Sequence, residues 1–182
     1  MSRYIIAIRP HGVEFAARRD RHMKLSMCGA LVSLALAAAA TMLAQTQKDA
    51  HIGTWKLNVA KSKFNPGPGY KSETRTYTPT ADGYKFEGER VNMDGSTPKY
   101  GFTVKYDNKD YPVTGKDPGG ADTIAVKLVD ANNIESTSKK GRDVLYTSKV
   151  VVSQDGKVMT ITTKGKNPDG EPFDNVQVYD RQ

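Results

Sequence analysis

Residues 143–164 read DVLYTSKVVVSQDGKVMTITTK, two runs of alternating side chains on either side of Asp155-Gly156. An extended chain points successive side chains to opposite faces, so every second residue of a run shares a face. Asp-Gly between two such runs favours a tight hairpin turn, because glycine adopts the required positive φ without strain. The stretch therefore predicts an antiparallel hairpin. One face of its first strand carries Val144, Tyr146, Ser148, Val150 and Val152.

The same turn signals recur through residues 45–182. Asp-Gly also occurs at 82–83, 94–95 and 169–170, and Lys140-Gly141 marks a fifth turn. Alternating runs fill the intervals, whereas the periodicity of an amphipathic helix is almost absent. The pattern predicts nine or ten strands, over residues 53–58, 71–79, 84–93, 99–106, 111–114, 122–129, 133–139, 143–153, 157–164 and 172–180.

Successive hairpins with few long connections indicate an antiparallel meander, whose two outer strands would leave unpaired edges. Closing the sheet into an up-and-down barrel removes those edges. About 30% of residues 45–182 are hydrophobic, which fills the core of a two-sheet sandwich poorly but suits a barrel with a partly polar interior. The expected fold class is therefore all-β, an antiparallel up-and-down (meander) β-barrel preceded by an N-terminal signal helix.

Residues 24–44 read KLSMCGALVSLALAAAATMLA, an apolar run that follows basic residues and ends in small ones. This is the layout of a secretory signal peptide. The run is short for a permanent membrane helix, although an uncleaved N-terminal anchor is the alternative. We expect cleavage after Ala44, or within Ala38–Ala40, and a secreted or periplasmic location. The predicted division is 1–22 as an extension or misplaced start, 23–44 as the signal peptide, 45–52 as a flexible N-terminus and 53–182 as the barrel domain.

The formal net charge of +7 is concentrated in the leader. Residues 1–44 hold six Lys or Arg and two Asp or Glu, so 21 of the 27 basic and 18 of the 20 acidic residues remain for the rest of the chain. That small excess is not the electrostatic footprint of a nucleic-acid-binding protein. Cys28, the only cysteine, also lies in the leader, so the remainder has neither a disulfide nor a thiolate nucleophile. We expect no nucleic-acid partner, and no membrane contact after cleavage.

The barrel region opens with Gly53-Thr54-Trp55-Lys56-Leu57 and closes with Val176-Gln177-Val178-Tyr179-Asp180. Gly-x-Trp on the first strand, a hairpin meander and a late Tyr on the last strand resemble the calycins, that is, lipocalins and fatty-acid-binding proteins. Over residues 51–182 the chain is most similar to small exported bacterial lipocalin-like proteins. The resemblance implies that Gly53 and Trp55 form a structural motif, in which Trp55 closes the bottom of the barrel.

The resemblance to fatty-acid-binding proteins breaks down at two places. Their last strand carries Arg-x-Tyr, which grips the ligand carboxylate, but here Gln177 stands in place of the arginine and only Tyr179 matches. Those proteins also insert two helices after the first strand, where this chain has the irregular loop 65–69. The sequence therefore argues against a fatty acid held by this clamp, and against a helical lid.

Side chains that could face the barrel interior are the candidate ligand contacts. A buried Arg75 would need a counter-charge, which an anionic ligand could supply; the alternative is that Arg75 points to water. Tyr84 and Phe86 could form an aromatic wall of a cavity or pack into a core, and a bulge near Gly88 would explain a switch of face beyond them. The candidate ligand-binding residues are Arg75, Tyr77, Tyr84, Phe86, Tyr106, Tyr146, Gln177 and Tyr179.

The residues needed for common catalytic and metal sites are missing. Glu87 and Glu89 share a face and could suggest paired carboxylates, but they alternate with apolar residues and mark the solvated side of a strand. His51 is the only histidine after the leader, in a segment expected to fray. The residues needed for a catalytic triad or a histidine-based metal site are therefore not all present. We expect no enzymatic activity, no cofactor and no metal.

The function expected from these features is an exported, non-catalytic barrel that binds a small, partly apolar ligand in its lumen. Such cavities combine apolar walls with a few polar anchors, so the expected partner is a small hydrophobic or amphipathic molecule. The alternative is a β-domain without a cavity that makes protein–protein or cell-envelope contacts. A lumen packed solid by side chains would favour that alternative.

Overall fold

Short antiparallel strands make up most of the structure, a computed structural model that describes residues 49–167 and 170–182. One 3-10 turn, η2 (Val59–Lys61), follows the first strand. The strands are β1 (Gly53–Leu57), β2 (Ser72–Pro79), β3 (Gly83–Val91), β4 (Lys99–Lys105), β5 (Asp107–Pro112), β6 (Thr114–Gly115), β7 (Thr123–Asp130), β8 (Asn133–Lys140), β9 (Asp143–Val152), β10 (Val158–Lys166) and β11 (Pro172–Arg181).

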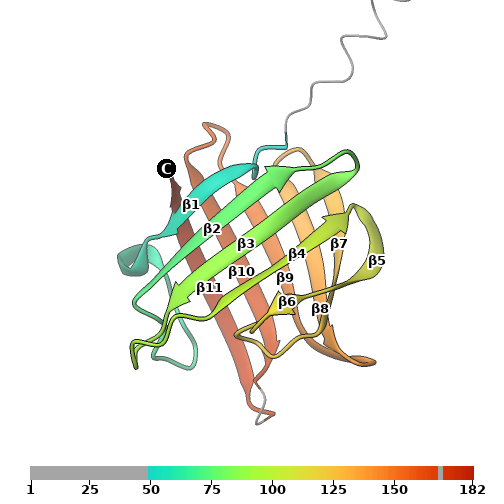
Figure 1. Cartoon of the computed structure of the whole chain (residues 1–182). Helices are drawn as coiled ribbons and strands as arrows, with labels where there is room; N and C mark the ends of the chain where they lie inside the picture. Colours follow the sequence, from blue (N-terminus) through green and yellow to red (C-terminus); the bar gives the residue numbers. More distant parts are fainter. Residues whose placement is uncertain (1–48, 168–169) are drawn as a thin grey trace, which may run out of the picture. The chain divides into compact units, whose positions relative to one another are not determined.

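The strands form one sheet in the order β5-β7-β8-β9-β10-β11-β1-β2-β3-β4-β6. Every pairing is antiparallel. Most pairings join strands that follow each other along the chain; the exceptions are β4 with β6, β5 with β7, and β11 with β1. There Trp55 lies opposite Arg181 and Leu57 opposite Tyr179. Figure 1 shows β1–β4 crossing in front of β8–β11, so that the sheet curls round on itself. The predicted all-β meander barrel is confirmed.

The barrel has a seam beside β4. At one end of the strand order β6 pairs with β4, and at the other end β5 pairs with β7, so the ladder does not close across this side. The prediction of nine or ten strands is too low, because residues 107–115 form two short strands instead of the one expected at 111–114. Asn108 has a positive φ of 59°, and the register of β5 shifts between Asp107 and Asp110, which keeps this segment irregular.

Glycines after the predicted turns have two different roles. Gly95, Gly141, Gly156 and Gly170 have positive φ values, as tight turns require. Gly83 belongs to β3 instead, and a Cβ atom there would lie 2.0 Å from the Val104 carbonyl oxygen. Position 83 therefore requires glycine because β3 and β4 approach each other closely there.

Strand β3 keeps one inner face along its whole length. Its register with β2 and β4 runs unbroken through Gly88, so the bulge expected there is absent. Tyr84, Phe86 and Gly88 are buried, and Arg90 continues the same face. Gly88 lies opposite Arg75 on β2, and a Cβ atom on it would meet the Phe86 and Tyr100 rings at 2.8 Å.

Residues 49–52 pack against the barrel. His51 is 1% exposed, the Ala50 amide donates to the Ala131 carbonyl oxygen at 2.9 Å, and the Trp55 indole N–H donates to the His51 carbonyl oxygen at 2.7 Å. The sequence predicts a flexible segment over residues 45–52, whereas in the structure residues 49–52 are packed against the barrel. The His51 ring lies among the aromatic side chains of Tyr77 and Tyr84.

Several predictions lie outside the described residues. They are the extension 1–22, the signal peptide 23–44 with its cleavage site and Cys28, and the first part of the segment 45–52. Within the described ranges, no helix has the length and apolar character needed to cross a membrane.

Candidate ligand-binding cavity

A cavity of about 310 Å³ lies inside the barrel. Side chains of β2, β3 and β4 line one wall, and side chains of β8–β11 line the opposite wall. The loop after β6 adds Asp117, Pro118 and Gly119 to the lining. The inward faces of these strands meet here because side chains alternate along each strand.

The wall of β2–β4 is aromatic. Tyr77, Phe86 and Phe102 lie opposite one another across three adjacent strands. The Phe86 and Phe102 ring centroids are 4.7 Å apart with an interplanar angle of 31°. Tyr84 lies within 5.5 Å of the Tyr77 ring, measured between centroids. This contiguous surface suits a flat or apolar ligand face.

Glu73 holds two arginines at the cavity wall. The carboxylate is fully buried and accepts from Arg75 Nε at 3.0 Å and from Arg90 Nη2 at 3.2 Å. The hydroxyls of Tyr100 and Tyr179 also donate to it. Burial would raise the pKa of the Glu73 carboxyl, but the two guanidinium groups outweigh burial and lower that pKa to about 2. Glu73 is therefore ionised at neutral pH.

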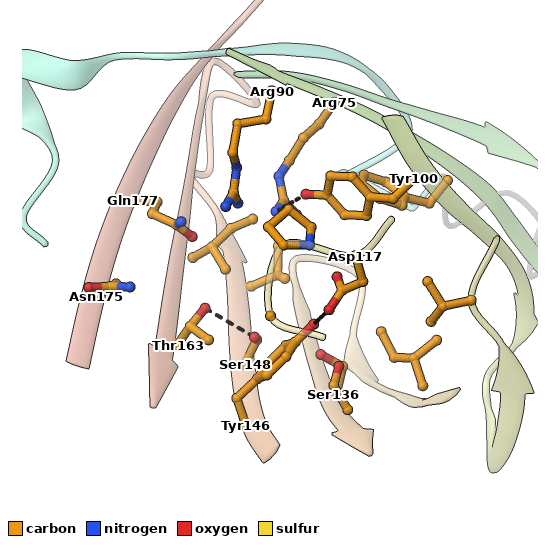
Figure 2. A pocket seen from close by; sticks show the side chains of 18 of the residues that line it. Arg75, Arg90, Tyr100, Asp117, Ser136, Tyr146, Ser148, Thr163, Asn175 and Gln177 are labelled. Atoms are coloured by element: carbon orange, nitrogen blue, oxygen red, sulfur yellow. Dashed lines mark hydrogen bonds between the residues drawn. The ribbon is translucent and has the colours of Figure 1, made fainter. Parts of the chain in front are cut away.

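One carboxylate serves two guanidinium groups in this cluster, which leaves an excess of one positive charge at the cavity wall. Arg75 and Arg90 both line the cavity, each with a side chain 15% exposed. Figure 2 shows both guanidinium groups reaching into it. Arg90 uses Nε and Nη2 on Glu73, and Nη1 takes no part in these bonds.

The tyrosines of the cluster are neutral and do not balance that charge. Burial raises the pKa of the Tyr100 and Tyr179 hydroxyls well above the ordinary value. Burial likewise raises the pKa of Tyr70 to about 12. These groups can donate or accept hydrogen bonds, but they carry no negative charge at neutral pH.

A second polar site lies across the cavity. The Tyr146 hydroxyl donates to Asp117 Oδ2 at 3.0 Å, and the Ala121 amide donates to the same oxygen at 2.9 Å. Burial, followed by the nearby Asp117 charge, raises the pKa of Tyr146. Figure 2 shows Tyr146 on the side of the cavity away from the two arginines, with Asp117 drawn between them. The lining therefore carries one carboxylate, Asp117, in addition to the two arginines held by Glu73.

The structure brings together six of the eight predicted ligand contacts. Those that line the cavity are Arg75, Tyr77, Tyr84, Phe86, Tyr146 and Gln177. Tyr179 lies behind the wall, fully buried against Glu73. Tyr106 lies elsewhere, where its hydroxyl donates to Asp49 Oδ2 at 2.7 Å and lies 3.1 Å from His51 Nε2.

Arg75 points into the barrel, so the alternative that it points to water is wrong. Its Nη1 donates to the Tyr77 hydroxyl at 3.3 Å and its Nη2 to the Tyr100 hydroxyl at 3.1 Å. Glu73, two residues earlier on the same strand, supplies the counter-charge that buried arginine requires. Gln177, at the position of the missing clamp arginine, donates to the Tyr70 hydroxyl.

Trp55 lies outside the cavity lining and is fully buried. The Arg181 guanidinium carbon lies 4.1 Å from the centre of its ring. Arg181 also donates to the Ile52 carbonyl oxygen at 2.8 Å and to the Ala50 carbonyl oxygen. Trp55 is therefore packed between the last strand and the segment that precedes β1.

Among the residues that the sequence analysis did not propose as ligand contacts, five belong to the Glu73 cluster or to the Asp117 site. One signal was available: Glu73 and Arg75 are two residues apart on a strand, so they share a face and can pair. Arg90 also alternates in step with Tyr84 and Phe86, which places it on their face. The missed residues are Glu73, Arg90, Tyr70, Tyr100 and Asp117.

Within the described ranges, the other residues considered for catalysis or metal binding do not form a site. Glu87 and Glu89 are exposed and pair with Lys85 at 2.9 Å and Lys99 at 3.2 Å. No group of three or more His, Cys, Asp or Glu side chains within residues 49–167 and 170–182 is arranged to hold a metal ion.

Comparisons with known proteins find similarity in structure and none in sequence family. No protein-family model matches the chain, and no curated protein matches it. A similar solved structure is the zebrafish ileal bile acid-binding protein complexed with cholic acid, with 12% identity, 73% of this chain and 99% of that chain covered, and a TM-score of 0.45. The fold is assigned from the strand pairing. The strands form a meander in which the last strand pairs with the first, and this is the topology that the resemblance to calycins implies.

Proposed function

We propose that this protein binds a small amphipathic anion in the lumen of its barrel and does not act as an enzyme. The observation that carries the proposal is a cavity of about 310 Å³ with two arginines and only one carboxylate on one wall. A buried charge is costly unless it is paired. A carboxylate, sulfate or similar group on the ligand would balance the second arginine, while the aromatic wall would contact its apolar body.

The cavity also favours binding over the alternative of a solid β-domain. That alternative requires a lumen filled by side chains, whereas the interior here is hollow and lined by both apolar and polar groups. The polar groups with perturbed pKa values point away from catalysis, since Glu73 is held ionised by arginines and the tyrosines are held neutral. Neither state suits proton transfer near neutral pH.

Isothermal titration with matched anions and neutral analogues tests the proposal. We expect 2-naphthoate and dodecanoate to bind with one ligand per chain, and 2-naphthalenemethanol and dodecanol to bind at least about tenfold more weakly. Arg90→Met should remove most of that preference, because Arg75 and Glu73 then form a balanced pair.

Lys99→Met is the matched control, since Lys99 is exposed and pairs with Glu89 on the outside of the barrel. It should leave every affinity unchanged. Failure of all four compounds to bind would refute the proposed function. Equal affinities for anions and alcohols would refute the role of the arginine pair.

We also propose that the protein is exported and that residues 23–44 are its signal peptide. The support is the sequence pattern of basic residues, an apolar run and small residues before Gln45. Mass spectrometry of the protein from secreting cells should find a chain that begins at Gln45. A chain that retains residues 24–44 would contradict cleavage.

A further inference from the structure

A row of polar side chains crosses the wall of β8–β11 inside the cavity. Ser136 lies opposite Ser148, Ser148 opposite Thr163, and Thr163 opposite Asn175. All four line the cavity, and we call them the polar belt. They share one level of the barrel because they occupy directly paired positions on four adjacent strands.

The neighbouring level of the same wall is apolar. Ile134, Val150 and Ile161 lie opposite one another on β8, β9 and β10, two residues from the belt on each strand. All three are buried and line the cavity. On β8, β9 and β10 this level is therefore apolar, and it continues on β11 as Gln177, which lies opposite Ile161.

Hydrogen-bonding capacity remains open along the belt. Ser148 and Thr163 bond each other through their hydroxyls at 3.1 Å, which leaves acceptor capacity on both. The Ser136 hydroxyl makes no side-chain hydrogen bond within the part of the chain that the structure describes. Asn175 accepts from the Asn65 amide at 2.9 Å, and its side-chain amide nitrogen takes no part in that bond.

Asp117 extends this polar side of the cavity. Its bonds from Tyr146 and Ala121 both end on Oδ2, so Oδ1 takes part in neither. Figure 2 shows Asp117 close to Tyr146, with Ser136 and Ser148 nearby, while the two arginines enter from the opposite side. A carboxylate oxygen inside a cavity favours a hydrogen-bond donor on the ligand.

We propose that the polar belt and Asp117 form a second subsite, which binds a hydroxyl group of the ligand. This inference rests on the proposed function and names the ligand class for the same cavity: a flat, ring-containing anion with a hydroxyl group at the end away from its acid. The aromatic wall contacts the ring, the arginines bind the acid, and the belt with Asp117 receives the hydroxyl.

The size of the cavity agrees with a compact ring system. Its 310 Å³ lie at the lower end of the range of about 300–1,000 Å³ for small-molecule sites. A straight alkyl chain would leave the belt hydroxyls and Asp117 Oδ1 without partners. Unpaired polar groups in a desolvated site disfavour such a ligand.

The test compares 6-hydroxy-2-naphthoate with 2-naphthoate by isothermal titration. The two anions differ only in one hydroxyl group at the far end of the ring from the acid. We expect the hydroxylated compound to bind roughly tenfold more tightly. In the double variant Ser136→Ala, Thr163→Val the two affinities should differ by less than about twofold, since both substitutions remove hydroxyls and keep the side-chain size.

Thr147→Val is the matched control, because Thr147 is an exposed hydroxyl residue next to Ser148 on the outer face of β9. It should keep the full preference. Equal affinities in the unmodified protein, or a preference that survives the double variant, would overturn the second subsite while lumen binding stands. Binding of dodecanoate but of neither naphthoate would also overturn it. Failure of every anion would instead refute the proposed function.

Discussion

Glu73 and His51 show how the surroundings of a single residue decide its chemical state. Glu73 is fully buried yet ionised, because two guanidinium groups face it. His51 is equally buried but faces only one acidic neighbour, Asp49, with the Arg181 charge nearby. Burial, partly opposed by Asp49 and assisted by Arg181, lowers the pKa of His51 to about 4. His51 is therefore neutral in the folded protein at neutral pH.

The pKa of His51 predicts how stability depends on pH. The unfolded chain binds a proton at His51 with a pKa near 6.5, whereas the folded chain does so only near 4. The unfolded state thus holds more protons between these values, so the free energy of unfolding falls as the pH is lowered from 6.5 to 4. The loss should be on the order of 3 kcal/mol and complete below the lower value.

Urea unfolding at a series of pH values measures this loss. The variant His51→Phe keeps a ring among Tyr77 and Tyr84 but cannot be protonated, so its stability should change less over the same range. Equal pH dependence in the two proteins would contradict the assignment. The ionisation of Glu73 contributes mainly below pH 4.5, outside most of this range.

At the scale of elements, the β3–β4 pair depends on close approach of two backbones. Gly83 has no room for a side chain, since a Cβ atom would lie 2.0 Å from the Val104 carbonyl oxygen and 2.8 Å from Lys105 Cα. The pair carries Phe86, Tyr100 and much of the aromatic wall, so its register also positions the cavity.

Gly83→Ala should therefore lower the free energy of unfolding by about 1–3 kcal/mol or more, because the strands must separate to admit the methyl group. Gly95→Asn is the control: Gly95 has a φ of 85° with open space around it, and asparagine tolerates that conformation. The control should lose less than about 1 kcal/mol. Thermal or urea unfolding of both variants checks this, and equal losses would contradict the close-approach argument.

At the scale of the whole molecule, Arg181 joins the end of the barrel to its beginning. Its guanidinium covers Trp55 and donates to the carbonyl oxygens of Ala50, Ile52 and Gly156. It therefore supports the β1–β11 pairing that closes the sheet, together with the turn between β9 and β10.

We expect Arg181→Met to lower the free energy of unfolding by about 3 kcal/mol, since three partly buried carbonyl groups lose a charged donor. Lys61→Met is the control, because Lys61 forms an exposed ion pair at 3.5 Å with Asp180, the residue before Arg181 on β11. Its loss should stay below about 1 kcal/mol. Equal stability of the two variants in urea would show that Arg181 does not hold the closure.

Much of the fold could be predicted from local patterns. Alternation in stretches such as 143–164 and the glycine turns located most strands, because strand periodicity and turn conformation are properties of neighbouring residues. Two errors came from places where local patterns say little: the irregular segment 107–115 and the expected bulge at Gly88. In both, contacts with distant strands decide the register.

The sequence by itself determined that residues after 52 form an antiparallel meander, and it singled out six side chains that line the cavity. Only the tertiary structure decided the charge of that cavity. Arg75 was visible as a candidate, but Arg90, Asp117 and the polar belt lie on segments far apart in the chain: β3, the loop after β6, and β8–β11. Curling of the sheet brings them to one lumen, and electrostatic and hydrogen-bonding partners are set by distance in space and not along the chain.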